Sequence, residues 1–271
     1  MRIVIKLAGA LLDDAQTTRQ LARQAVELAH EGHEILVVHG GGKTFTATLA
    51  RMGIQSRFVN GLRVTDRETR DVALMVLGGL LNKRLAAAIS QAGQPAVGIS
   101  GGNAACFLAE PMMHDETVGG LGFVGYLTGV NLEFLESLWH AGIMPVAASL
   151  GLGPDGEVYN INADHMAAAC AEFIHAERLI YLTDVAGVLD GSKVLKVVSC
   201  DQIEELVRQK KVSGGMVLKL EACKRALAAG VRQVRIVGGA LPRALLSAAN
   251  GGKSPGTQVT RAVHAATAAP R

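Results

Sequence analysis

The sequence is poor in aromatic residues and in clustered charge. Only ten of its 271 residues are aromatic, namely one Trp, three Tyr and six Phe, and the formal net charge is +3. A nucleic-acid surface gathers its basic groups on one face, whereas the Lys and Arg residues of this chain are spread along its length. We therefore expect no nucleic-acid partner, and the composition favours small anions as ligands.

Cysteine spacing and the absence of a long apolar run exclude further classes. The cysteines at 106, 170, 200 and 223 form no CxxC pair, so the sequence predicts no zinc site and a reduced cytoplasmic location. Apolar residues make up 49% of the chain, but no run approaches the ~20 uninterrupted apolar residues of a membrane span. Residues 1–12 resemble a signal peptide only superficially, because Lys6 interrupts them and no cleavage site follows. We expect a soluble protein without a membrane partner.

Strand-like and helix-like segments alternate along most of the chain. A strand at 3–7, a helix that Thr17 or Thr18 would cap and Gly32 would stop, and a strand at 34–38 form a right-handed βαβ unit. Further strands are predicted at 95–99, 144–149, 178–183 and 233–237, helices at 43–52, 65–92, 132–141, 165–175, 201–209 and 217–229, and hairpins within 106–128. The chain is thus predicted to be an α/β protein with a parallel sheet, in one large domain or two lobes.

Glycine-rich segments follow the first two predicted strands. Gly9 comes soon after the first strand, and His39-Gly40-Gly41-Gly42 ends the second. Ligands of parallel sheets bind beyond the carboxyl ends of the strands, where bare backbone can approach a ligand and cradle an anion with its N–H groups. For three glycines alone, an ordinary flexible turn is an equal alternative. We interpret His39 as a structural histidine.

Asp164 stands where the strand-like segment 159–161 runs into an apolar helix. A carboxylate at this place is favoured by the free N–H groups and by the helix dipole. Lys6 lies within an apolar strand, where burying an ammonium without an anion is costly, and Lys219 lies early in a helix. We expect Asp164 to hold both lysines around a phosphoryl group in transfer, which predicts a small-molecule kinase. Taken singly, Asp164 could be a helix cap and Lys219 a solvated charge.

Arg63 precedes the predicted helix at 65–92. Thr65 and Glu68 have the spacing of a capping box at the start of that helix. This position would place Arg63 on the chain entering a helix N-terminus, where it could bind a carboxylate, and a surface arginine is the alternative.

Three glycine patterns fail on their context. Gly42-Lys43-Thr44 ends like a P-loop, but that motif needs a glycine where this chain has Val37. The GxGxxG pattern at 120–125 lacks a preceding strand and a following helix, and the one at 151–156 turns into another strand. We therefore reject dinucleotide binding.

Six motifs, in their order along the chain, resemble the acetylglutamate kinases of the amino acid kinase family. They are Lys-Leu-x-Gly at 6–9, His-Gly-Gly-Gly at 39–42, Asn-Gly-Leu-Arg-Val-Thr at 60–65, Asn-x-Asn-Ala-Asp at 160–164, Thr-Asp-Val-x-Gly-Val-Leu at 183–189 and Gly-Gly-Met-x-x-Lys at 214–219. The resemblance implies a three-layer α/β/α sandwich with a mainly parallel central sheet. It also implies an N-terminal lobe for acetylglutamate binding and dimerisation at 1–150, a C-terminal lobe for ATP at 151–260, and a disordered tail at 261–271.

The resemblance further implies transfer of the γ-phosphoryl group of MgATP to the γ-carboxylate of N-acetyl-L-glutamate, the second step of arginine synthesis. Lys6 and Lys219 would stabilise the transferring group and Asp164 would orient both. The substrate-binding residues would be Gly41, Gly42, Arg63 and Asn160, with Arg63 on the α-carboxylate. The ATP-binding residues would be Gly9, through its N–H, and Asp184, Val185, Ala186, Gly187, Val188, Leu189, Lys211, Val212 and Ser213. Mg²⁺ would be bound mainly through ATP, and a carboxylate nucleophile needs no general base.

Two departures and two alternatives accompany the resemblance. The family usually reads Lys-x-Gly-Gly, and this chain has Ala8 before Gly9. A positive φ at Ala8 would cost on the order of 1 kcal/mol; otherwise its N–H would remain available, and we expect altered phosphate geometry with retained activity.

The chain starts at the first strand, whereas arginine-inhibited members have an extra N-terminal helix, so we expect a homodimer insensitive to arginine. The alternatives are a sister kinase for carrier-protein-bound aminoadipate or glutamate, and a nucleotide-binding regulator without turnover.

Overall fold

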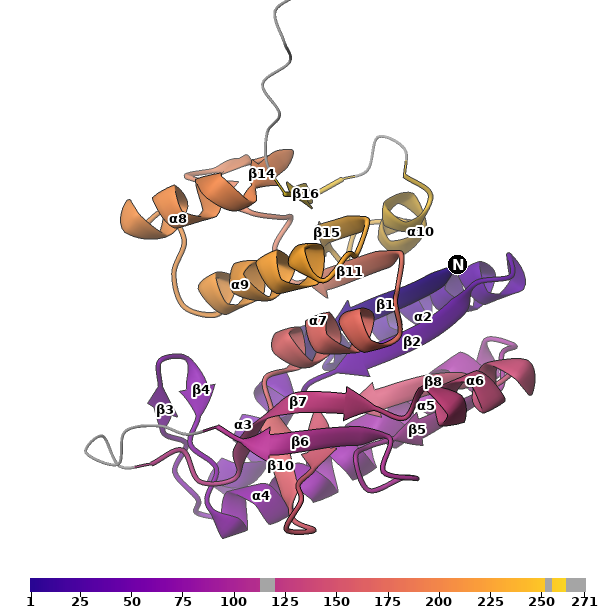
Figure 1. Ribbon diagram of the computed structural model, residues 1–271, viewed down its shortest axis with the longest axis vertical. Helices are drawn as coiled ribbons and strands as arrows, with labels where there is room; N and C mark the ends of the chain where they lie inside the picture. Colours follow the sequence, from indigo (N-terminus) through magenta and orange to yellow (C-terminus); the bar gives the residue numbers. More distant parts are fainter. Residues whose placement is uncertain (113–119, 252–254, 262–271) are drawn as a thin grey trace, which may run out of the picture.

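An eight-stranded sheet forms the centre of the computed structural model, which describes residues 1–112, 120–251 and 255–261. The strands follow the order β14-β16-β15-β11-β1-β2-β8-β5 across the sheet (Figure 1). Their bounds are β1 Arg2–Leu7, β2 Glu34–His39, β5 Ala96–Ile99, β8 Met144–Ala148, β11 Arg178–Thr183, β14 Val197–Ser199, β15 Gln233–Gly238 and β16 Thr257–Thr260. Neighbouring strands are parallel except for β15 and β16. The predicted α/β class with a mainly parallel central sheet is therefore confirmed.

Helices cover both faces of this sheet because its strands are apolar on both sides. Ile3 and Ile5 of β1 pack into a core with α2 (Ala15–His30), α5 (Asn82–Gln91) and α10 (Ala244–Ala249). Val4 of the same strand packs into the core on the other face, with α7 (Ala163–Phe173) and α9 (Gly215–Ala228). Side chains alternate between the faces of a strand. Lys6 therefore points to the same face as Val4, the face that α7 covers.

A second group of short strands contributes side chains to the core on the face of the sheet that α7 covers. Strands β6 (Phe107–Pro111), β7 (Val124–Val130), β9 (Leu150–Leu152) and β10 (Val158–Ile161) close into a small sheet. The hairpin of β3 (Phe58–Val59) and β4 (Leu62–Arg63) projects at the edge toward which β1 and β2 point (Figure 1). The hairpin of β12 (Leu189–Asp190) and β13 (Lys193–Val194) follows β11. The antiparallel pairing of β6 and β7 confirms the hairpin predicted within 106–128.

The remaining helices are α1 (Gly9–Leu12), α3 (Gly42–Arg51), α6 (Leu132–His140) and α8 (Cys200–Arg208). The long predicted helix is continuous from α4 (Arg67–Ala73) through the π-helix η1 (Leu74–Leu81) into α5. In the described part of the chain, this run of Arg67–Gln91 is the one helix long and apolar enough to cross a membrane. Half of its most apolar stretch is buried in the protein, as in the core helix of a soluble protein. Length and composition alone are therefore weak evidence that this helix spans a membrane.

Two helix starts were predicted wrongly. Helix α2 is capped by Asp14, which accepts from the N–H of Thr17, so Thr17 lies inside the first turn. Helix α4 is capped by Asp66 rather than by a Thr65–Glu68 capping box. Thr65 is not available as a cap because it forms a β-bridge with Gly122 and its hydroxyl donates to a backbone carbonyl. In both places an aspartate, a strong N-cap residue, precedes the helix.

The division into lobes at residue 150 stays a prediction. β1 pairs with both β2 and β11, so the central sheet runs continuously from the first half of the chain into the second. The disordered tail predicted at 261–271 lies, from residue 262 on, outside the described residues.

Candidate functional site

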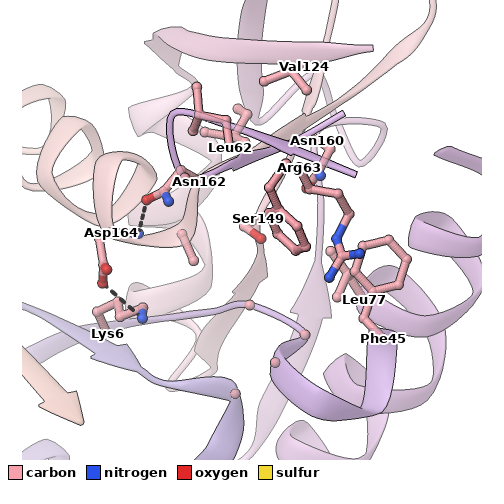
Figure 2. Close-up of a pocket in the computed structure, with 18 residues that line it drawn as sticks. Lys6, Phe45, Leu62, Arg63, Leu77, Val124, Ser149, Asn160, Asn162 and Asp164 are labelled. Carbon is pink, nitrogen blue, oxygen red and sulfur yellow. Dashed lines mark hydrogen bonds and ion pairs between the residues drawn. The ribbon is translucent and has the colours of Figure 1, made fainter. Parts of the chain in front are cut away.

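A cleft opens at the carboxyl ends of β1 and β2, between the sheet and the β3–β4 hairpin (Figure 2). Seven of the residues predicted for the site line it, namely Lys6, Gly9, Gly41, Gly42, Arg63, Asn160 and Asp164. They come from β1, the two turns that follow β1 and β2, the β3–β4 hairpin, β10 and the start of α7. The parallel sheet therefore gathers at one edge residues that lie far apart in the sequence.

The two predicted lysines meet at Asp164. The Nζ atoms of Lys6 and Lys219 each lie 2.8 Å from Asp164 Oδ1. Lys6 is 6%, Asp164 8% and Lys219 5% exposed, so the three charged groups are buried together. Lys219, in the second turn of α9, does not line the cleft and joins the site through Asp164. The predicted convergence of these three groups is present in the structure.

The local sequence holds Asp164 firmly in place. Asn162 is the N-cap of α7, and its Oδ1 accepts hydrogen bonds from the N–H groups of Asp164 (3.0 Å) and His165 (3.2 Å). Tyr181 of β11 donates its hydroxyl to the carbonyl of Asp164 at 3.1 Å, and Lys219 Nζ lies 5.0 Å from the centre of its ring. Tyr181 was missed in the sequence, because a tyrosine within an apolar strand gives no sign of its role.

The electrostatics leave this cluster with an excess of positive charge. Burial raises the pKa of Asp164, but the attraction of Lys6 and Lys219 outweighs burial and lowers the pKa to about 2. Burial lowers the pKa of Lys6, which the attraction of Asp164 opposes. One carboxylate thus faces two ammonium groups in a region where little water screens them. A further anion at this point would be stabilised.

Gly9 and Gly42 bring two backbone turns into contact. A Cβ atom on Gly9 would lie 2.4 Å from the backbone N of Gly42, and Gly42 itself has a φ of +48°. Gly9 opens α1, and the first N–H groups of a helix have no partner within it. The two turns can therefore present backbone donors to a ligand only because neither carries a side chain.

Ala8 fits its position without strain. Its φ is −67° and its ψ is 139°, an extended conformation that any residue adopts. Its N–H donates to the carbonyl of Leu182 at 2.9 Å, since the ladder between β1 and β11 extends to this residue. The expectation that this N–H remains available to a ligand was therefore wrong.

Arg63 is held between two aromatic rings. Its guanidinium carbon lies 4.8 Å from the ring centre of Phe45 and 4.6 Å from that of Phe58. It donates to the hydroxyls of Thr46, at 2.7 Å, and Ser56. No carboxylate within the described residues forms an ion pair with it. Burial lowers its pKa. The result is a fixed cation with neutral neighbours at the mouth of the cleft, suited to a ligand carboxylate.

Phe58 and its neighbours were missed in the sequence, although a signal was present. Asn60 and Gly61 both have positive φ, at 49° and 80°, and turn the chain between β3 and β4. An Asn-Gly pair is a strong signal for such a two-residue hairpin. Recognising it would have paired Phe58 with Arg63 across the strands, as the structure does.

Asn160 is tied to Arg63 through Thr65. Its Nδ2 donates to the hydroxyl of Thr65 at 3.1 Å, and this hydroxyl donates to the carbonyl of Arg63 at 2.9 Å. With Nδ2 engaged, the amide of Asn160 offers its Oδ1 as an acceptor at the cleft. Arg63 and Asn160 thus present a cation and an acceptor in a fixed relation.

The two segments predicted to bind ATP, 184–189 and 211–213, lie outside this cleft. They belong to the part of the fold that the second half of the chain forms. Residues 184–189 follow β11, the neighbour of β1, and residues 211–213 precede α9. The first segment is fixed by the N–H of Val188, which donates to the hydroxyl of Thr257 at 2.8 Å. In the second segment, Lys211 Nζ lies 2.8 Å from a carboxylate oxygen of Asp190, the residue that directly follows the first segment. Their role in ATP binding stays a prediction.

A metal ion would have few protein ligands here. In the ranges that the structure covers, no three His, Cys, Asp or Glu side chains gather into a group that could hold a metal. Asp164, the acid nearest the cleft, is already engaged by two lysines. A divalent cation at this site would depend on oxygens of the ligand.

Comparison with known proteins gives a family and close relatives. Residues 1–238 match the model of the amino acid kinase family. The chain is 52% identical over 240 residues to the acetylglutamate kinase of Koribacter versatilis, covering 88% of this chain and 90% of that protein. It is 47% identical over 239 residues to the acetylglutamate kinase of Acidobacterium capsulatum, with coverage of 88% and 90%.

Solved structures agree at the level of the fold. The N-acetylglutamate synthase of Neisseria gonorrhoeae superposes with a TM-score of 0.85 at 24% identity, over 96% of this chain and 59% of that chain. An isopentenyl phosphate kinase superposes with a TM-score of 0.68 at 20% identity, over 96% and 100%. The present chain therefore spans a little over half the length of the synthase, and at these identities the likeness concerns the fold alone.

Proposed function

The chain belongs to the amino acid kinase family, and we propose that it transfers the γ-phosphoryl group of ATP to the γ-carboxylate of N-acetyl-L-glutamate. The observation that carries this proposal is the buried cluster of Lys6, Asp164 and Lys219 at one end of a cleft whose other end holds Arg63. Two relatives that share about half of their residues with this chain are acetylglutamate kinases. The reaction would serve arginine synthesis, in the cytoplasm.

Phosphoryl transfer to a carboxylate depends on position and charge. A carboxylate is already a nucleophile, so no residue has to remove a proton from it. Lys6 and Lys219 would stabilise the negative charge on the transferring group, and Asp164 would keep both ammonium groups at fixed positions. The backbone N–H of Gly9 would donate to the oxygens of the same group.

The other end of the cleft would select the acceptor. Arg63 would bind the α-carboxylate, and the Oδ1 of Asn160 would accept from the amide N–H that acetylation leaves on the amino acid. Gly41 and Gly42 would contact the γ-carboxylate from the turn after β2. Fixing a reactant at both ends brings its carboxylate to the phosphoryl group without further ordering.

ATP would bind across residues 184–189 and 211–213, beside the second half of the sheet. Mg²⁺, bound mainly through the phosphates and water, would neutralise part of their charge. Gly9, which lines the cleft and follows β1, the neighbour of β11, would contact the phosphoryl group.

We also propose that the protein is a homodimer. The run Arg67–Gln91 exposes a row of apolar side chains, Leu74, Met75 and Leu80, with Gly78 and Gly79 between them. Small residues within an exposed apolar stripe allow a second helix to approach closely. A second copy of the same stripe would complement it about a two-fold axis.

The test is an acyl-phosphate assay with hydroxylamine trapping. We expect ATP-dependent product with N-acetyl-L-glutamate and much less with glutamate, aspartate or aminoadipate. Lys6→Ala and Lys219→Ala, checked for folding by circular dichroism, should lose the signal. Turnover with only a carrier-bound aminoadipate would favour the sister kinase, and ATP binding without turnover on any acceptor would favour a regulator.

A further inference from the structure

His39 and Asn82 form a buried polar pair behind the glycine turn. His39 is the last residue of β2 and Asn82 the first of α5, and both are fully buried. Asn82 Nδ2 lies 3.1 Å from His39 Nε2 and 2.8 Å from the carbonyl of Val146. The other ring nitrogen of His39, Nδ1, lies 3.2 Å from the carbonyl of Gly40.

These contacts determine which nitrogen of the ring carries the proton. The amide nitrogen of Asn82 must face the carbonyl of Val146, since an amide oxygen there would place two acceptors together. Its second hydrogen then points to His39 Nε2, which must accept. A neutral imidazole with an acceptor at Nε2 has its hydrogen on Nδ1, so His39 donates to the carbonyl of Gly40. Burial lowers the pKa of His39 to about 4, which keeps the ring neutral.

This hydrogen bond fixes the peptide unit between Gly40 and Gly41. The unit is planar and trans, so its C=O and its N–H point in opposite directions. With the carbonyl of Gly40 directed at the buried ring, the N–H of Gly41 is directed away from it, and both glycines line the cleft. No backbone acceptor in the described part of the chain takes that N–H.

We infer that His39, oriented by Asn82, is a positioning residue that aims the backbone N–H of Gly41 at the reacting end of the cleft. Three glycines in a row would otherwise allow this peptide to rotate, because glycine restricts its neighbours little. A donor that is held in place before the substrate arrives costs no reorganisation when charge develops. The inference rests on the proposed function for the identity of the group that receives the hydrogen bond.

The first test needs no turnover. Long-range ¹H–¹⁵N NMR spectra of the histidine-labelled protein distinguish the two neutral tautomers of each ring, and the signal of His39 is identified by its loss in His39→Asn. We expect the Nδ1–H tautomer in the wild-type protein, and a weaker preference for it in Asn82→Leu, which removes the donor to Nε2 but leaves the carbonyl of Gly40 in place. A wild-type ring with its proton on Nε2 would overturn the inference, whether or not the protein is a kinase.

The second test uses two variants of His39, each of which can retain one of the two hydrogen bonds of the ring. Asn at position 39 can place an amide N–H near the site of Nδ1, whereas Gln places its amide near the site of Nε2 and loses the donor to Gly40. We expect His39→Asn to keep kcat/KM for N-acetyl-L-glutamate close to the wild-type value. We expect His39→Gln to lower it by about tenfold or more, with the KM for ATP unchanged.

The thermal midpoints of both variants separate positioning from packing. Each replaces an aromatic ring by a smaller side chain, so similar losses of stability are expected. Equal loss of activity in the two variants, in proportion to their loss of stability, would show that His39 only fills space and would overturn the inference. Wild-type protein with the Nδ1–H tautomer but without any turnover would instead contradict the proposed function.

Discussion

Lys6 and Lys219, which are far apart in the sequence, contact the same oxygen atom, Oδ1 of Asp164, each at 2.8 Å. One carboxylate oxygen thus separates two buried ammonium groups, and it is the only acid that pairs with either of them among the described ion pairs. The three groups together carry one more positive than negative charge, so an incoming anion would be stabilised beside them. Removing Asp164 would leave two like charges buried beside each other.

Asp164→Asn should therefore abolish turnover and also destabilise the fold. Loss of one partner of a buried ion pair typically costs about 3–5 kcal/mol, because the remaining charge has no compensation. Urea unfolding at pH 7 measures this loss, and Asp201→Asn, an exposed acid in the first turn of α8, is the matched control with little expected change. Stability equal to that of the wild type would mean that the lysines are not charged in the folded protein.

His39 should make the protein less stable in mild acid. Burial lowers its pKa from 6.5 to about 4, so between these values the unfolded chain binds a proton that the folded protein does not. The associated stability is complete above pH 6.5 and is lost as the pH falls to about 4. It amounts to about 3 kcal/mol, because each pH unit between the two pKa values contributes about 1.4 kcal/mol.

The comparison with His39→Asn isolates this contribution. His33 and His165 also have pKa values lowered by burial and remain in the variant. We expect urea unfolding from pH 4 to pH 7 to give a flatter profile for the variant than for the wild type. Parallel profiles would indicate that the His39 ring can be protonated without leaving its site.

Gly9→Ala should inactivate the enzyme, whereas Ala8→Gly should not. A Cβ on Gly9 would meet the backbone of Gly42, and separating the two turns would move the donors of both. We expect kcat to fall at least about a hundredfold, as when a donor of an oxyanion site is removed. Ala8 is extended and its N–H is engaged by Leu182, so glycine there should change kcat little. Comparable losses in both variants would point to a general weakening of this turn.

The sheet could be predicted from the sequence because its signals are local. Apolar strands such as Arg178–Thr183 and turns at glycines follow from composition over a few residues, and the convergence of Lys6 with Gly41 follows from the rule for parallel sheets. Contacts between distant side chains could not be predicted in this way. Phe45 packs on Arg63 and Asn82 on His39 only once the helices are docked, and neither pair has a periodic signal.

Arg63→Met should weaken acceptor binding selectively. The variant keeps an unbranched side chain between Phe45 and Phe58 but loses the charge that would hold the α-carboxylate. We expect the KM for N-acetyl-L-glutamate to rise by about tenfold or more, the loss typical of a charged hydrogen bond, with the KM for ATP unchanged. Arg51→Met, at the exposed end of α3, is the control. A rise confined to the KM for ATP would place the acceptor elsewhere.

Met75→Lys should dissociate the proposed homodimer. Met75 is 61% exposed in the middle of the apolar stripe formed with Leu74 and Leu80, and a lysine there would bury an unpaired charge against the second copy. Sedimentation equilibrium should give twice the chain mass of 28.3 kDa for the wild type and a single chain for the variant.

Met52→Lys is the matched control, since Met52 is 53% exposed at the end of α3, outside the stripe, and this variant should remain a dimer. A wild-type monomer at micromolar concentration would contradict the proposal, and a dimer that persists in Met75→Lys would place the interface on another surface. Because Asn82 follows this helix segment directly and contacts His39, kinetic comparison of the monomeric variant with the wild type would also reveal whether dimerisation influences the glycine turn.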